Sequence, residues 1–141
     1  MQRTHWPATH TRHVALRLTP GADLRGALDD AFRRSGASAG FIVAQVGSLT
    51  HARLRPAGRD DAVEIPGPLE IVSLSGTFSP DGPHLHLAVS DAGCAVYGGH
   101  LLTGCPVRTT AELILGVTDA ARFSRERDVE TGYAELVIRP A

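Results

Sequence analysis

The sequence predicts an α+β fold: a single domain in which one antiparallel β-sheet is flanked by one main helix, at about residues 23–35. Two observations predict this class. One stretch carries the apolar spacing of a helix face, and six or seven later stretches have the composition of strands, separated by Gly, Pro and Asp turns. Because those turns are short and a parallel crossover needs a dozen or more residues, we expect antiparallel pairing.

The chain begins with a polar segment that precedes the domain. Residues 1–11 contain Pro7 and show no periodicity, so we expect a loose tail followed by one domain at 12–141. Apolar and more polar residues alternate over 12–18, which is the period of a half-buried strand. The apolar positions there are Val14, Leu16 and Leu18.

The helix has signals at both ends. Asp23 is a residue type that caps helix N-termini, and Gly36 stands where a helix can end in a left-handed turn. The apolar residues between them recur every three or four positions and define one face. They are Leu24, Ala27, Leu28, Ala31 and Phe32.

The remainder of the chain has the composition of strands. Stretches rich in Val, Ile, Leu and aromatic residues are bounded by turn residues, with no linker or internal repeat. The predicted strands cover 40–49, 51–55, 69–78, 84–89, 94–102, 107–117 and 133–139.

Composition limits the function classes. The 141 residues, 43% of them hydrophobic, are enough for one domain with its own core. No apolar run is long enough to span a membrane, and the first residues lack the order of a signal peptide, so we expect a cytoplasmic protein without a membrane partner. A formal charge of -1 opposes nucleic-acid binding by electrostatics alone.

Two residue types need separate comment. All fourteen basic residues are Arg, with no Lys and no Asn, which indicates coding bias more than a phosphate-binding function. Two groups of arginines are interleaved with acidic residues or followed by them, and we interpret both as solvated faces or subunit contacts. The first group is Arg53, Arg55 and Arg59, and the second is Arg122, Arg125 and Arg127. The two cysteines, Cys94 and Cys105, lack CxxC spacing and are expected to be free, buried thiols.

Three of the seven histidines are predicted to meet. His84 and His86 are two apart in one strand, so they share a face with Cα atoms about 6.6 Å apart. A three-residue loop at 91–93, with Gly93 left-handed, would place His100 opposite His84 and Gly98 opposite His86. The expectation depends on parity, because a shift of one residue would turn His100 to the other face.

Such a cluster predicts a metal site. Three histidines with an open fourth position are the arrangement of catalytic zinc, whereas an ordinary half-exposed HxH pair is the alternative interpretation. The other histidines, at 5, 10, 13 and 51, scatter along the chain and are expected to be solvated or structural.

Glu112 and Arg108 are two further candidates in a predicted strand. Glu112 lies between apolar neighbours, so it either faces water or forms a salt bridge, or it is buried with a partner and orients a metal-bound histidine or acts as a general acid/base. Arg108 is a candidate to hold a substrate carboxylate with two hydrogen bonds.

Longer motifs extend these predictions. The run LEIVSLSGTF, then HLHLAV, then VYGGHLLTGCPVRTTAELILG resembles the plants-and-prokaryotes-conserved (PPC) domain, and the likeness extends from Arg12 to the Asp128, Thr131 and Gly132 motif. The segment GGHL at 98–101 is its most specific part. In plants this domain accompanies AT-hook motifs that bind DNA, and in bacteria and archaea it stands alone and carries the label of a DNA-binding protein. No Arg-Gly-Arg-Pro core of an AT-hook is present in this chain.

The resemblance implies a fold, an assembly and a metal. It implies a homotrimer that binds zinc through His84, His86 and His100, with Gly98 and Gly99 beside the site. The fold is similar to that of acetolactate decarboxylase, a zinc lyase. Three function classes therefore stay open: a bacterial DNA-associated or regulatory protein, a zinc enzyme of lyase or hydrolase type acting on a small keto or hydroxy acid, and a plain oligomeric scaffold.

Overall fold

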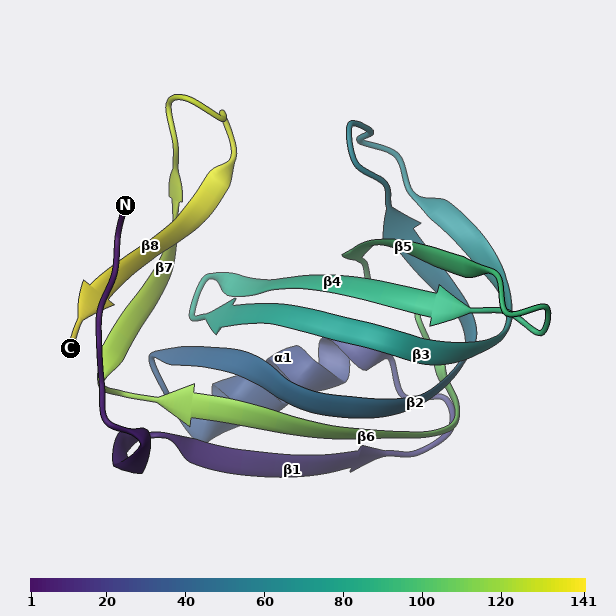
Figure 1. The fold of residues 1–141 in the computed structure, drawn as a ribbon, viewed down its shortest axis with the longest axis horizontal. Helices are drawn as coiled ribbons and strands as arrows, with labels where there is room; N and C mark the ends of the chain where they lie inside the picture. The colour runs from purple at the N-terminus through teal and green to yellow at the C-terminus, as the bar shows by residue number, and fades with distance from the viewer.

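The computed structural model describes all residues from 1 to 141 and contains a six-stranded antiparallel sheet, one α-helix and a separate two-stranded sheet (Figure 1). The predicted α+β class is thus confirmed. In chain order the elements are η1 (Ala8–His10), β1 (Arg12–Leu18), α1 (Leu24–Ser35), β2 (Ala39–Arg55), β3 (Val63–Ser79), β4 (Gly82–Ser90), β5 (Val96–Leu101), β6 (Val107–Thr118), β7 (Ala121–Arg127) and β8 (Ala134–Pro140).

The helix begins and ends where the sequence predicts. The Asp23 side chain accepts a hydrogen bond from the Gly26 amide at 2.9 Å, and Gly36 adopts the left-handed conformation with φ of 68°. The second carboxylate oxygen of Asp23 accepts from the amides of Gly104 and Cys105 at 2.8 and 2.9 Å. The cap therefore also joins the helix to the segment between β5 and β6.

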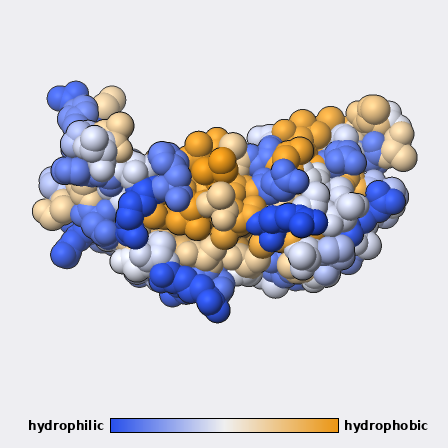
Figure 2. All heavy atoms as spheres, turned by 90° about the horizontal axis from the view of Figure 1, so that it is seen from below, coloured by the Kyte–Doolittle hydropathy of each residue, from blue (hydrophilic) through white to orange (hydrophobic).

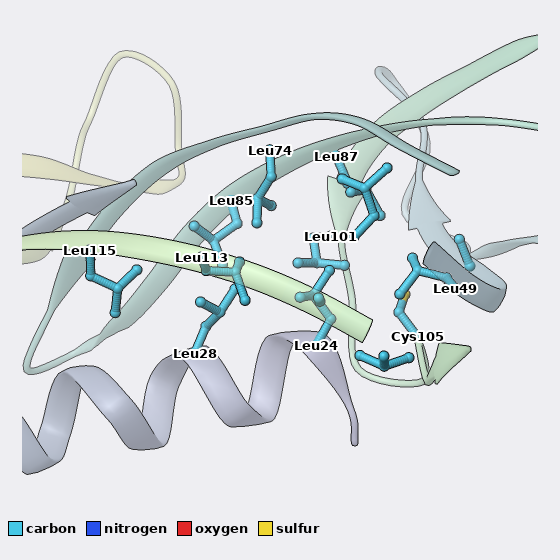
Figure 3. Close-up of a cluster of buried hydrophobic side chains, with 14 of the residues drawn as sticks. Leu24, Leu28, Leu49, Leu74, Leu85, Leu87, Leu101, Cys105, Leu113 and Leu115 are labelled. Carbon is cyan, nitrogen blue, oxygen red and sulfur yellow. The ribbon is translucent and has the colours of Figure 1, made fainter. Parts of the chain in front are cut away.

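The main core lies between α1 and the sheet. Figure 3 shows leucines from the helix meeting leucines from β3, β4, β5 and β6. The helix contributes Leu24, Leu28 and Phe32, all at most 1% exposed. Burying such side chains stabilises a fold by about 1.5–3 kcal/mol each, so this layer fixes which face of each strand points inward.

The sheet bends back on itself. Its strand order is β1-β6-β2-β3-β4-β5, and the end of β2 also pairs with β5 through Leu54 with Leu101 and Arg55 with His100. This extra pairing is possible because β2 is 17 residues long and its ladders contain bulges, which bend a strand. It brings the end of β2 beside β5.

Some strands differ from the sequence prediction. β2 continues through the position where two strands were predicted, with a bulge between Leu49 and His51. β3 begins at Val63, six residues before the predicted start. Residues 63–69 pair with β2 alone, and such an edge segment can contain Pro66, Gly67 and Pro68, which would interrupt a central strand. β7 was not predicted, because its four charged residues concealed the alternation that begins with Ala121 and Phe123.

The β7–β8 hairpin stands beside the main sheet and has its own small core. Ala39, Ala121 and Phe123 form this cluster, and Trp6 packs against it. The side chain of Gln2 accepts a hydrogen bond from the Ile138 amide at 2.8 Å. The segment 1–11, expected to be loose, therefore lies along this hairpin, as the N-terminal run in Figure 1 shows.

The two cysteines differ in environment. Both are free, as predicted, but only Cys105 is buried, and the prediction that Cys94 is buried is wrong. Cys94 lies in the loop between β4 and β5, where nothing covers it. Burial raises the pKa of the Cys105 thiol to about 11.

The outward face of the sheet exposes apolar side chains. Val43, Val46, Val72 and Ile114 are between 37% and 58% exposed on the neighbouring strands β2, β3 and β6. Figure 2, which looks onto the β1 edge of the sheet, shows hydrophobic surface in the middle and upper right of that view, with hydrophilic residues beside it. No helix in the structure has both the length and the apolar character needed to cross a membrane.

Candidate metal centre

Three histidines gather on the outer face of β4 and β5. On β4 the core side chains are Leu85, Leu87 and Val89, so the strand's two-residue period turns His84 and His86 the other way. His100 on β5 follows the same rule, since its neighbour Leu101 is fully buried. The ligand nitrogens of the three histidines lie within 4.8 Å of one another. The predicted convergence is therefore present.

The register of this hairpin differs from the prediction. His100 pairs with His86, not with His84, and Gly98 pairs with Ala88. The loop holds five residues, 91–95, in place of three, and the left-handed residue is Cys94 with φ of 62°, not Gly93. The two additional residues shift the register by an even number, so parity is kept and all three rings still share a face.

The side chain of Asp91 builds this longer loop. Its Oδ1 accepts hydrogen bonds from the amides of Gly93 and Ala95 at 2.9 and 3.0 Å. Its Oδ2 accepts from the Tyr97 hydroxyl at 3.3 Å. An Asp that bonds to backbone amides a few residues later favours a turn, so Asp91 stabilises the longer loop together with the backbone bonds between residues 91 and 95.

The donor set fits a zinc-like ion. The ring centroids lie 5.0 to 5.9 Å apart, and the Nδ1 atom of His100 is buried without a hydrogen-bond partner. Tetrahedral zinc bonds of 2.0–2.1 Å place donor nitrogens roughly 3.4 Å apart, and the ligand nitrogens of the three histidines lie within 4.8 Å of one another. A buried, unpartnered imidazole nitrogen costs free energy that a ligated metal would recover.

The surroundings of His84 and His100 favour the neutral form of both rings. Burial first, and then the neighbouring His84 and Arg55, lower the pKa of His100 to about 4. The pKa of His84 is also lowered, first by burial and then by Arg125. Only a neutral imidazole has a lone pair to give to a metal, so the lowered pKa values of His84 and His100 favour the ligating form of these two rings.

A pocket of about 470 Å³ opens beside His84 and His100. It lies between the β7–β8 hairpin on one side and the β2 end and the start of α1 on the other. Its wall is polar and carries three arginines. The charged and aromatic residues in it are Arg25, Arg55, Asp81, Arg125, Tyr133 and Glu135.

Arg125 contacts the histidine cluster directly through its side chain. Its Nη2 donates to the Thr77 hydroxyl at 2.7 Å, and its Nη1 lies 3.4 Å from Nδ1 of His84. The Arg125 amide donates to Asp81 at 2.9 Å, which fixes β7 against the β3–β4 turn. Arg125 and Arg55 thus both line the pocket beside the histidines, a position that their sequence surroundings did not indicate. The subunit contacts expected for the two arginine groups stay a prediction.

The other predicted residues lie elsewhere. Glu112 is exposed on β6, in register with Arg17 and Val46, and Arg108 is exposed on the same strand. Neither lines the pocket beside the histidines. Glu112 is thus exposed, in agreement with the first of the two alternatives that the sequence left open.

The two glycines belong to the strand that carries His100. Gly98 lies on the same face as His100 but outside the pocket lining. Gly99 faces β2, where a Cβ would come within 2.9 Å of the Arg55 carbonyl oxygen. Its lack of a side chain lets β2 and β5 approach and pair.

Sequence reasoning missed Arg55 and Arg125. A usable signal existed for Arg125, which is the third member of the alternating series Ala121, Phe123, Arg125 on the inner face of β7. A charged residue in an apolar series points to a site. No local signal marked Arg55, since it reaches the pocket only through the β2–β5 pairing.

The fold and the cluster define a class: a small α+β domain with a three-histidine cluster at the mouth of an arginine-lined pocket. The chain belongs to the Plants and Prokaryotes Conserved (PCC) domain family, and the sequence pattern of that family matches residues 7–119. This is the PPC family that the sequence motifs resemble. β7 and β8, which supply Arg125 and Glu135, lie beyond the matched residues.

Similar proteins extend the match. A hypothetical protein from Salmonella is 41% identical, with a TM-score of 0.90 over 96% of this chain and 99% of that one. A metal-containing protein from Archaeoglobus fulgidus is 27% identical, with a TM-score of 0.77 over 89% of this chain and 93% of that one. A structure from Bacteroides thetaiotaomicron, described as a candidate DNA-binding protein, is 19% identical with a TM-score of 0.73 and shows the fold alone.

Two curated relatives are longer. Proteins named Bifunctional protein GlmU from two Synechococcus strains are 46% and 47% identical over 94% and 89% of this chain. The chain spans about a fifth of their length.

Proposed function

We propose that this chain is a zinc-binding member of its family and that His84, His86 and His100 hold the metal. The observation that carries the proposal is the set of three imidazoles on one face of the β4–β5 ladder, with ligand nitrogens within 4.8 Å of one another. The description of the Archaeoglobus relative as metal-containing supports it. Three protein ligands leave a fourth position for water or a ligand, as in catalytic zinc sites.

A bound zinc ion would supply a Lewis acid at this position. The chain's own residues would shape its surroundings. Arg125 and Arg55 bring positive charge to the pocket, Glu135 brings an acceptor, and the core under β4 and β5 holds the rings in place. The acid/base role predicted for Glu112 and the carboxylate-binding role predicted for Arg108 stay predictions, and our proposal does not depend on them.

Zinc titration tests the metal proposal. The purified protein, stripped with a chelator, should take up one zinc ion per chain against a chromophoric competitor. His84→Ala and His100→Ala should each lower the zinc affinity. The loss should exceed about 10–100-fold, which is the usual effect of removing a residue that only hydrogen-bonds to a metal ligand. His51→Ala is the matched control, because His51 lies on β2 outside the cluster. Zinc uptake unchanged in both cluster variants would contradict the proposal.

We propose that the chain assembles as a homotrimer. The support is the apolar outward face of β2, β3 and β6, where Val43, Val46 and Val72 are about half exposed. Apolar surface gathered on one face favours association with another chain.

An enzymatic role is the second candidate. The pocket beside the cluster favours it, because a metal with an open position next to polar groups can act on a small keto or hydroxy acid in a lyase or hydrolase reaction. The test is to incubate the zinc-loaded protein with such acids and to measure product formation. Activity of the wild-type protein that is absent from His84→Ala would support this role.

A DNA-associated regulatory role is implied by the family label. The formal charge of -1 opposes it, since duplex binding without a basic surface lacks its main source of affinity. A gel-shift titration at low ionic strength decides the matter. If no duplex is retained there, the DNA-associated role is excluded.

A further inference from the structure

Three guanidinium groups meet at the histidine cluster from separate parts of the fold. Arg25 comes from the first turn of α1, Arg55 from the end of β2 and Arg125 from β7. None of them forms an ion pair. Ion pairs with carboxylates do occur elsewhere in the chain, at Arg12, Arg33, Arg34, Arg53, Arg59 and Arg139.

The hydrogen-bonding capacity of these three groups is largely unused. Arg25 donates to the Pro83 carbonyl at 3.5 Å and Arg55 to the Arg59 carbonyl at 3.4 Å, both long contacts. Arg125 has a short bond to Thr77, but its Nε is buried without a partner. A guanidinium carries five donors, so all three groups keep donors for another acceptor.

Neither of the two carboxylates that line the pocket forms an ion pair with these arginines. Burial lowers the pKa of Arg125, and the charge of Glu135 opposes this shift by favouring the charged form. Asp81 accepts from the Arg125 amide at 2.9 Å, and Glu135 accepts from the Thr131 hydroxyl at 3.0 Å. With three arginines and two acids, the pocket wall has a formal charge of +1 before any metal is added. A metal cation would increase the positive charge further, and a bound anion would offset it.

Arg125 and a metal compete for one atom. Arginine can only donate, so Nδ1 of His84 is the acceptor in their 3.4 Å contact and carries the lone pair of the neutral ring. The same lone pair cannot serve a metal. Loading through that nitrogen would therefore release the Nη1 donor of Arg125 beside the metal.

We infer that the pocket binds a small organic acid, with its carboxylate paired to Arg125 and with Arg25 and Arg55 contributing positive charge. This inference rests on the proposed function, since the acid is the ligand beside the metal. The planar fork of arginine matches a carboxylate, and a pocket of about 470 Å³ suits a small molecule.

Calorimetric titration of the zinc-loaded protein tests the inference. Lactate is the probe, lactamide is its neutral analogue, and inorganic phosphate represents the other oxyanion. Lactate should bind, and lactamide should bind at least about tenfold more weakly, as expected for loss of a charge-assisted hydrogen-bonded pair.

Variants on β7 locate the contact. Arg125→Gln should weaken lactate binding at least about tenfold, and Arg125→Lys should restore only part of it, because lysine keeps the charge without the fork. Arg127→Gln is the matched control, an exposed arginine on the same strand outside the pocket. Zinc stoichiometry and the unfolding temperature of each variant verify that the domain is intact.

The outcomes separate this inference from the metal proposal. A wild-type protein that takes up no zinc contradicts the proposed metal site, whatever lactate does. Zinc uptake without lactate binding overturns the carboxylate inference and leaves the metal site standing. Equal lactate affinity in the Arg125→Gln and wild-type proteins, or binding of phosphate alone, also overturns it.

Discussion

His86 and His100 are direct partners in the β4–β5 ladder, and their ring centroids lie 5.9 Å apart. The pairing follows from the five-residue loop at 91–95, which Asp91 holds through two backbone hydrogen bonds. We therefore expect Asp91, a carboxylate outside the pocket, to influence the relative position of the two rings.

Asp91→Ala should disturb both the fold and the metal site. The loss of two hydrogen bonds should lower the free energy of unfolding by about 1–3 kcal/mol, measured by urea denaturation. Because the loop sets the register of His100, zinc affinity should also fall. Asp128→Ala is the control, since Asp128 accepts from the amides of Glu130 and Thr131 in a comparable turn away from the cluster. Equal zinc affinity in both variants would show that the loop does not position His100.

The site could be predicted from sequence only where local periodicity determines it. The alternation in β4 turns His84 and His86 to one face whatever the register, so that part of the prediction did not depend on the loop. The partner of His100 did depend on the loop, and the side-chain bonding of Asp91 was not visible in the sequence spacing. The predicted partner of His100 was wrong by two residues. Because a shift by an even number of residues keeps a side chain on the same face of the sheet, the predicted face was nevertheless right.

The pocket depended on contacts between distant segments. Arg55 approaches His100 because the bent β2 pairs with β5, and Arg125 approaches His84 because β7 folds back on the β3–β4 turn. Neither contact leaves a periodic signal. The helix, in contrast, could be predicted to the residue at both caps, since Asp23 and Gly36 act locally.

Asp23→Ala should destabilise the domain more than an ordinary cap substitution. Its carboxylate accepts from three backbone amides, one in α1 and two at Gly104 and Cys105. We expect a loss of about 2–4 kcal/mol in the free energy of unfolding. Asp30→Ala on the same helix removes only an exposed ion pair with Arg34 and should cost below about 1 kcal/mol. Similar losses in the two variants would refute the bridging role of Asp23.

The stability of the protein should fall between about pH 9 and 11. Burial raises the pKa of Cys105 from 9.0 to about 11, so in this range the unfolded chain has released the proton that the folded chain keeps. Stability is then lost as pH rises, with a slope of up to about 1.4 kcal/mol per pH unit for one proton. The absence of Lys removes one group that would otherwise titrate here.

Urea denaturation at several pH values measures this slope. Cys105→Ala should be less stable near neutrality, because it leaves a small cavity, but its stability should change less over the alkaline range. Cys94→Ala, which alters an exposed thiol, should keep the wild-type slope. A Cys105→Ala protein with the full wild-type slope would assign the effect to another group.

Val46→Asp should dissociate the proposed trimer. Val46 is 58% exposed on the outward face of β2, where its register neighbour on β6 is Glu112. A carboxylate placed there would face Glu112 and would have to lose its water in an apolar interface, which costs several kcal/mol when no partner is supplied.

Val129→Asp is the control, because Val129 is 97% exposed in the β7–β8 loop, away from that face. Light scattering over a range of concentrations should give trimer mass for the wild type and for Val129→Asp, and monomer mass for Val46→Asp. A trimer that survives Val46→Asp would place the subunit contact on another surface.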